Sequence, residues 1–249
     1  MRYLLLILLI GFLTVSCKNE SDQSMPNAKE IIERSIEVSG GEVIANSEIS
    51  FKFRELFYKA KRQNGLFEFS RRSIKDDSVI VDVLTNSKFE RFVNDSLVDL
   101  SDEDIKKFTS SVNSVHYFSV LPFGLTDKAV NHKYLDSSEI KGEKYHVIEI
   151  TFNKEGGGED FNDVFLYWIN KNNFKVEYLA YQYFTEGGGL RFREASNERY
   201  VNGVRFVDYN NYKPETKLVK LTELEALFTS GNLELLSNIE LEDIECVIN

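Results

Sequence analysis

The sequence predicts a mainly β protein of the α+β class, built on a long antiparallel meander with two amphipathic helices. Five candidate strands follow one another with short turns between them: 144–153, 162–170, 174–185, 190–200 and 203–212. Strands joined by short connections pair with their neighbours, so at least these five form one sheet. The helices fall at 28–38 and 101–120, where apolar residues recur at helical spacing.

The N-terminus has the pattern of a secretory signal peptide, which we place at residues 1–16. A short basic start precedes the apolar run Tyr3–Leu13, and small residues lead into Cys17. The run is too short for a membrane-spanning helix, which needs roughly 20 apolar residues. A cysteine at this point resembles a bacterial lipobox, although Thr14 stands where a leucine is expected. We therefore predict lipidation at Cys17 and a polar tether over 17–27, with an ordinary cleaved signal peptide as the alternative.

The acidic composition excludes one class of partner. The chain has 30 basic and 40 acidic side chains and a net charge of −10. Phosphate backbones require basic patches, so we expect no nucleic-acid partner. Anionic lipid head groups would also repel the surface, so attachment to a membrane would depend on acyl chains. Cys246 is the only thiol besides Cys17, which leaves no disulfide framework, and we expect it to be half-buried in a strand.

The first helix and the strands after it are marked by local signals. Asn27 is a good N-cap, and Gly40-Gly41 ends the helical pattern. Beyond it, apolar and polar residues alternate as they do in strands with one buried face. Four strands are expected from this alternation, around residues 49–53, 67–69, 79–83 and 89–93.

The second helix begins at Ser101, whose hydroxyl suits an N-cap and precedes an acidic first turn. This helix should stop near Pro122. Towards the C-terminus, residues 221–229 are ambiguous but favour a helix, and 233–248 return to strand alternation. We find no linker inside 28–249 and therefore expect a single domain there.

Two central strands have no polar face. Both alternating sets are apolar or aromatic in 164–169, and the stretch 174–184 is similar. An antiparallel sheet covered on one side usually alternates cleanly. These strands therefore need a second covering, which leaves three possibilities: another sheet, a closed barrel, or a cavity for an apolar guest. A simple filled core also remains open.

The order of elements resembles a known superfamily. A lipobox, a helix ending in Gly-Gly, four strands, a middle helix and an aromatic meander containing Tyr167-Trp168-Ile169-Asn170 are similar to the LolA and LolB lipoprotein carriers and receptors. More narrowly, the chain is similar to uncharacterised Bacteroidetes lipoproteins of that group. The resemblance covers about 28–248. It implies a strongly curved, half-open β-barrel with a helical lid over a cavity that accepts acyl chains. It transfers no individual site residue.

Catalytic, metal and cofactor motifs are weak. Two Glu-Gly-Gly-Gly loops, 155–158 and 186–189, lie at alternate turns and so on the same edge of the sheet, but neither opens a helix as a phosphate loop does. The histidines His116, His132 and His146 lack zinc-site spacing. Acidic residues 159–163 lack the regular spacing of a calcium loop. We expect no catalytic residue, no metal and no cofactor.

We therefore predict a non-enzymatic lipoprotein of the bacterial envelope, facing the periplasm or the cell exterior, that binds a lipid or the acyl chain of another lipoprotein. The residues expected to line its cavity are Phe108, Val112, Val115, Trp168 and Tyr178. The alternative is an envelope interaction scaffold with a filled core, which binds other envelope proteins and no ligand.

Overall fold

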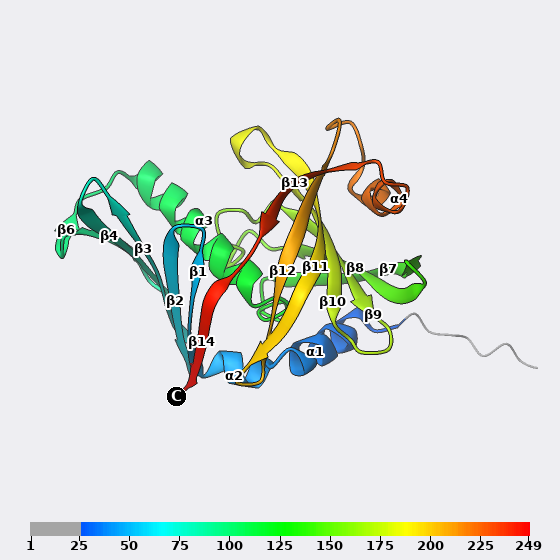
Figure 1. The fold of residues 1–249 in the computed structure, drawn as a ribbon, viewed down its shortest axis with the longest axis horizontal. Coiled ribbons are helices and arrows are strands. Elements are labelled where there is room, and N and C mark those ends of the chain that lie inside the picture. Colours follow the sequence, from blue (N-terminus) through cyan, green and yellow to red (C-terminus); the bar gives the residue numbers. More distant parts are fainter. Residues whose placement is uncertain (1–25) are drawn as a thin grey trace, which may run out of the picture.

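The computed structural model describes residues 26–249, which form two seven-stranded antiparallel sheets with helices packed around and between them (Figure 1). The α+β class is confirmed. The predictions for the signal peptide at 1–16, for Cys17 and for most of the tether at 17–27 fall outside the described residues.

The first sheet has the order β14-β1-β2-β3-β4-β5-β6. Its strands are β1 (Ser47–Phe53), β2 (Leu56–Gln63), β3 (Leu66–Lys75), β4 (Ser78–Thr85), β5 (Phe89–Val93), β6 (Ser96–Val98) and β14 (Glu242–Ile248). Two of these strands, β2 and β6, were not predicted. In β2 the inward positions are held by Tyr58, Ala60 and Arg62. Alanine and arginine conceal the apolar alternation that marks a half-buried strand.

The second sheet has the order β13-β12-β11-β10-β9-β8-β7. Its strands are β7 (Val130–Ile140), β8 (Glu143–Phe152), β9 (Val164–Asn170), β10 (Val176–Tyr183), β11 (Gly189–Val201), β12 (Val204–Pro214) and β13 (Leu233–Ile239). The five predicted strands of the meander are confirmed as β8 to β12. The edge strand β7 was not predicted, because polar residues occupy most of its positions.

The C-terminal segment joins the two sheets. Only residues 240 and 241 separate β13, at the edge of one sheet, from β14, at the edge of the other (Figure 1). Side chains of the β11–β12 hairpin hold this crossing: Arg199 Nη2 donates to the Leu241 carbonyl at 2.6 Å, and Asn202 Nδ2 donates to the Cys246 carbonyl at 2.7 Å. Strand pairing thus gives two open sheets joined at this corner in place of one half-open barrel.

Helices α1 (Ala28–Val38) and α2 (Gly41–Ala45) pack at one end of the second sheet (Figure 1). The Asn27 side chain caps α1 by accepting from the Lys29 N–H at 3.0 Å, as predicted. Between the helices, Gly40 has a φ of 85°, and a Cβ there would clash with the Gly203 carbonyl. Glycine is required at this corner because it touches the β11–β12 turn.

Helix α3 (Asp102–Ser119) lies between the two sheets (Figure 1). Ser101 caps it by accepting from the Asp104 N–H at 3.2 Å, which confirms the predicted start. Val112 on one side of α3 is fully buried against the first sheet, with Ala60, Phe69 and Leu84. Tyr117 and Phe118 on another side pack against the second sheet.

The second sheet is covered on both faces, as its two-sided apolar strands require. Ile31 and Ile32 of α1 and the end of α3 cover the inner face, which presents Phe165, Tyr167 and Leu179. The outer face is covered by a one-turn 3₁₀ segment (Leu221–Glu223) followed by α4 (Leu224–Thr229). The helix favoured at 221–229 is therefore confirmed, and it conceals the outer aromatic side chains.

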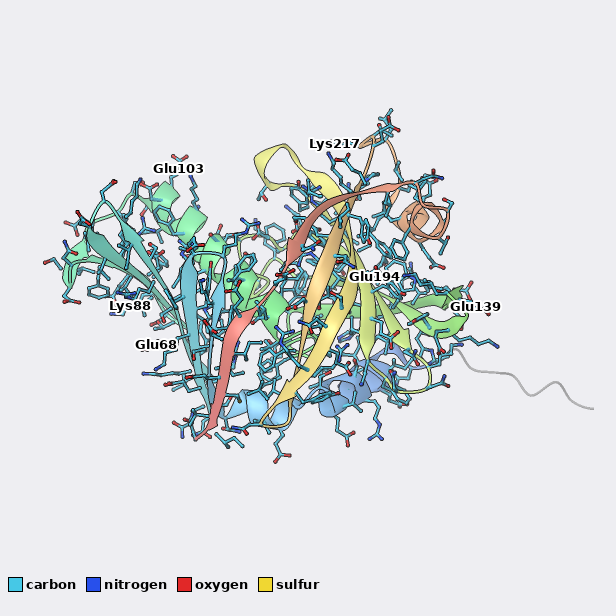
Figure 2. The ribbon with its side chains drawn as sticks, in the orientation of Figure 1. Glu68, Lys88, Glu103, Glu139, Glu194 and Lys217 are labelled. Atoms are coloured by element: carbon cyan, nitrogen blue, oxygen red, sulfur yellow. The ribbon has the colours of Figure 1, made fainter. Side chains whose placement is uncertain are left out.

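Exposed charged side chains lie on several elements of the surface. Glu68 and Glu103 project from the first sheet and α3, and Glu139 projects from β7 (Figure 2). Cys246, expected to be half-buried, is 4% exposed and unpaired, and burial raises the pKa of its thiol.

Candidate functional site

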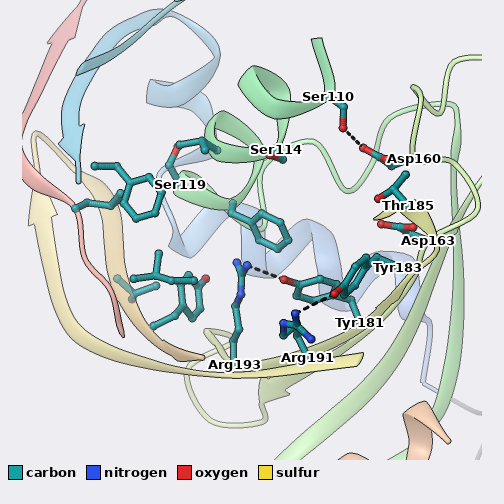
Figure 3. Close-up of a pocket in the computed structure, with 17 residues that line it drawn as sticks. Ser110, Ser114, Ser119, Asp160, Asp163, Tyr181, Tyr183, Thr185, Arg191 and Arg193 are labelled. Atoms are coloured by element: carbon teal, nitrogen blue, oxygen red, sulfur yellow. Dashed lines mark hydrogen bonds between the residues drawn. The ribbon is translucent and has the colours of Figure 1, made fainter. Parts of the chain in front are cut away.

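An open pocket of about 330 Å³, which we call the main pocket, lies between α3 and the inner face of the second sheet (Figure 3). This volume is at the lower end of the range for small-molecule pockets, roughly 300–1,000 Å³. Its apolar lining comes from β1, α3, β12, β13 and the crossing segment, through Phe53, Val115, Phe118, Val207, Ile239 and Leu241.

Strand β11 places two arginines on the pocket side of the sheet. Arg191 and Arg193 are two residues apart and both line the pocket, whereas Phe192 between them packs into the core on the outer face. Successive side chains of a strand point to opposite faces, so this placement follows from the register. The register pairs Arg191 with Tyr181 and Arg193 with Leu179 of β10.

Both arginines contact tyrosines of the neighbouring strand. Arg193 Nη2 donates to the Tyr181 hydroxyl at 2.7 Å, and Arg191 Nη2 donates to the Tyr183 hydroxyl at 2.9 Å (Figure 3). The Arg193 guanidinium carbon also lies 3.9 Å from the ring centroid of Phe118. The result is a row of hydrogen-bond donors beside the apolar wall.

One edge of the pocket is acidic. Asp160 and Asp163 belong to the β8–β9 loop, and Asp160 accepts a hydrogen bond from Ser110 of α3. Thr185, from the β10–β11 loop, lines the same edge. The β8–β9 and β10–β11 loops, which contain the two glycine-rich segments, therefore lie on one edge of the sheet, as predicted, and residues close to those segments line the pocket.

Asp163 is 9% exposed and its Oδ1 has no hydrogen-bond partner. Burial, and then the neighbouring Asp160, raises the pKa of Asp163 to about 6. The folded protein thus binds this proton more tightly than the unfolded chain does. The associated stability is present at acidic pH and is lost as the pH rises through about 6.

We expect Asp163→Asn to be more stable than the unsubstituted chain at pH ~8, by about 2–3 kcal/mol, and nearly equal to it at pH ~4. Asparagine keeps the oxygen that accepts from the Phe184 N–H but carries no buried charge. Urea unfolding at the two pH values measures the difference. Asp77→Asn, at an exposed aspartate, is the control. An equal gain in the free energy of unfolding at both pH values would contradict a raised pKa for Asp163.

A second pocket of about 280 Å³ lies on another side of α3 and is lined by Arg62 and His116. Arg62 is 7% exposed, and its guanidinium carbon lies 4.7 Å from the Phe69 ring centroid. His116 is fully buried, and burial lowers the pKa of its imidazole to about 3. It is therefore neutral, and its Nε2 lies 3.1 Å from the Ser70 carbonyl.

The five residues predicted to line one cavity are divided among three places. Val115 lines the main pocket. Phe108 and Val112 face the first sheet, where Phe108 stacks on Phe89 at 6.2 Å. Trp168 and Tyr178 lie on the outer face of the second sheet under α4. Because both faces of these strands are apolar, their spacing did not determine which face looks towards α3.

Sequence reasoning missed the polar residues that give the pocket its character. Arg191 and Arg193 alternate with Leu190 and Phe192, a pattern that usually indicates a solvent-exposed polar face. Here that face looks into the space under α3. Ser110 and Ser114 of α3, spaced one helical turn apart, were an available signal for a polar edge on the same helix.

Two further observations concern residues 26–249 only. No three His, Cys, Asp or Glu side chains in this part of the chain are grouped as metal ligands would be. None of its helices combines the length and the apolar character that crossing a membrane requires.

Comparison with known proteins identifies one matching family and several similar solved structures. Residues 2–241 match the model of a family described as a family of unknown function (DUF6503). A search of curated protein sequences gave no significant match.

Among solved structures, the chain is similar to a LolA superfamily protein from Nitrosomonas europaea, with 14% identity, a TM-score of 0.48, and coverage of 88% of this chain and 92% of that one. It is also similar to a putative outer membrane lipoprotein-sorting protein domain from Vibrio parahaemolyticus, with 10% identity, a TM-score of 0.42, and coverage of 74% of this chain and 86% of that one. A third similar structure is the Mycobacterium tuberculosis lipoprotein LppX, with 12% identity, a TM-score of 0.30, and coverage of 66% of this chain and 91% of that one. All three TM-scores are below 0.5, so any functional assignment depends on the pocket itself.

Proposed function

The chain belongs to the family of unknown function DUF6503, and we propose that it binds or carries a hydrophobic ligand, a lipid or the acyl chain of a lipoprotein, in the pocket between α3 and the second sheet. The role is binding without catalysis. The observation that supports this proposal most is an open pocket of about 330 Å³ lined by both apolar and polar side chains.

The shape and chemistry of the pocket support an amphiphile as the ligand. Phe118, Val207 and Leu241 offer an apolar wall that would otherwise face water. The polar groups of the pocket come from β11, which carries the two arginines, and from the two loops of the rim (Figure 3). Sites of this type bury the apolar body of a ligand and fix its orientation through a few polar contacts.

Acylation of Cys17 completes the proposal, because it would hold the pocket near a membrane of the cell envelope. Durable anchoring takes two acyl chains, since one chain binds only marginally. The polar residues from Lys18 onward would then act as a tether between the lipid and α1.

The test is mass spectrometry of lipids extracted from the purified full chain. We expect lipid to accompany the unsubstituted protein and Ser114→Phe to lose most of it. Ser114 lines the pocket, and a ring placed in the space that the ligand occupies should cost about 1–3 kcal/mol of binding, a loss of roughly 5- to 150-fold in affinity. Lys107→Phe places the same ring on an exposed part of α3 and should leave the lipid in place. The N-terminal peptide of the same digest reports acylation at Cys17.

The interaction scaffold remains a second candidate because of one surface. Phe57, Leu66 and Ile74 are 48%, 67% and 63% exposed and lie on the same outward face of the first sheet. A stable protein partner recovered by crosslinking, from a chain that carries no lipid, would favour the scaffold over the carrier.

A further inference from the structure

The main pocket contains two positive charges that no described carboxylate neutralises. Neither Arg191 nor Arg193 takes part in an ion pair with a side chain that the structure describes. Two other arginines do form such pairs: Arg205, 4% exposed, lies 2.5 Å from a Glu198 oxygen, and the partly buried Arg71 lies 2.6 Å from an Asp82 oxygen. Arg62, 7% exposed, resembles Arg193 in that it lies over aromatic rings and pairs with no described carboxylate. A buried charge without a counter-ion is costly, so the pocket favours an incoming anion.

Arg193 is the more enclosed of the two. It is 7% exposed, its Nε has no hydrogen-bond partner, and its guanidinium lies over the rings of Phe118 and Tyr181. Aromatic faces attract a cation but accept no strong hydrogen bond from its N–H groups. Arg193, which lines the pocket, therefore keeps hydrogen-bonding capacity that no described residue uses.

Arg191 and the tyrosines extend the same donor array. Arg191 donates to the Tyr183 hydroxyl and to the Leu190 carbonyl at 2.8 Å. Each tyrosine hydroxyl accepts from an arginine, so its own proton remains free to donate. A planar fork of N–H groups is the arrangement that recognises carboxylate and phosphate oxygens.

The acidic edge limits where an anion can sit. Asp160 and Asp163 line the rim that the β8–β9 loop forms, on the side of the pocket where Thr185 also lies (Figure 3). Their charge repels an anion from that rim and leaves the arginine side as the favourable position. Phe118 and Val207 then lie next to the bound head group, where an apolar chain can follow.

Resting on the proposed function, we infer that the ligand is an anionic amphiphile, whose carboxylate or phosphate head group binds Arg191 and Arg193 while its apolar chain lies along Phe118 and Val207. The arginines select the head group, and the apolar wall supplies affinity for the chain.

The experiment compares two photoreactive long-chain probes that differ only at the head, one a carboxylate and the other an alcohol. Each is crosslinked to the full chain in a nonionic detergent, and the labelled peptides are mapped by mass spectrometry. We expect the carboxylate probe to label the pocket at least about tenfold more than the alcohol, the size of a charge-assisted hydrogen bond to a buried cation.

Three substitutions make the assignment specific. Arg193→Gln should bring the ratio of carboxylate to alcohol labelling close to one while alcohol labelling persists. Arg193→Lys should retain part of the preference for the carboxylate probe. Arg191→Gln, at a half-buried side chain whose loss leaves the core intact, should also lower the ratio. Arg72→Gln, at an exposed arginine of β3, is the matched control and should leave the ratio unchanged.

The outcomes separate this inference from the proposed function. Equal labelling of the pocket by both probes in the unsubstituted chain would overturn the head-group assignment and leave ligand binding intact. Absence of both probes from the pocket peptides would overturn both the head-group assignment and the proposed ligand binding. Labelling confined to peptides around Arg62 would move the site to the other pocket and also overturn the assignment.

Discussion

Asp82→Ala is expected to destabilise the protein by about 3–5 kcal/mol, the cost of removing one partner from a buried ion pair. Asp82, 2% exposed on β4, lies in register between Arg71 of β3 and Arg91 of β5. Its oxygens accept from Arg71 Nη2 at 2.6 Å and from Arg91 Nε at 2.6 Å. Alanine would leave two largely buried cations side by side.

The same cluster fixes α3 to the first sheet. Arg71 Nη1 donates to the Ser111 hydroxyl at 2.7 Å, and the Arg91 guanidinium carbon lies 3.6 Å from the Phe108 ring centroid. Loss of Asp82 should therefore also loosen the first half of α3. Urea unfolding measures the stability, and hydrogen exchange across α3 measures the loosening.

Two controls give the Asp82 result its meaning. Glu68→Ala, which breaks an exposed pair with Lys61 at 3.7 Å, should cost less than about 1 kcal/mol. Replacing all three charges together, as Arg71→Met, Asp82→Leu and Arg91→Met, should recover most of the stability, because a packed apolar set of similar volume often substitutes for a buried ion cluster. A cost below 1 kcal/mol for Asp82→Ala would show that the cluster contributes little.

Phe192→Ala is expected to cost about 3–5 kcal/mol because it leaves a cavity under α4. Phe192 is fully buried, and its ring centroid lies 4.6 Å from that of Phe228 and 5.4 Å from that of Trp168. The Trp168 indole N–H also donates to Glu225 of α4 at 2.6 Å. Removing the central ring should weaken the docking of α4 on the outer face.

Trp168 reports this change directly, because it is the only tryptophan of the chain. We expect its fluorescence to shift to the red in Phe192→Ala as water reaches the indole, alongside the loss of stability in urea. Phe184→Ala, at a 53% exposed phenylalanine outside this cluster, should change both by little. An unshifted emission with full stability would mean that α4 is not needed to cover this face.

The helix starts and the strands of the meander were predicted correctly because each depends on interactions between residues close together in the sequence. Asn27 and Ser101 start their helices because a side-chain oxygen next to the first turn satisfies a free backbone N–H, which needs no distant partner. The strands β8 to β12 were found because tight turns separate them. Strand β2 was missed because Arg62 occupies an inward position, where only the rings of Phe69 and Phe123 make an arginine acceptable.

The sequence predicted that the central strands need a second covering, but it did not identify most of the residues that line the pocket. The excess of apolar surface on β9 and β10 correctly required a second covering, yet the sequence could not say which face α4 would take. Of the predicted lining, Val115 reaches the pocket, and the polar groups Arg193 and Asp163 were not anticipated. A strand pattern shows that alternate residues share a face, and it does not show whether that face meets solvent or another element.

By itself, the sequence determined the class of fold, the meander, the helix caps and the need to cover both faces of the central strands, since each of these follows from spacing along a short stretch of chain. Only the tertiary structure decided that two sheets form, that α4 conceals Trp168, and that Arg191 and Arg193 share a pocket with α3. These features depend on contacts between segments far apart in sequence. One example is the crossing from β13 to β14, which joins the two sheets.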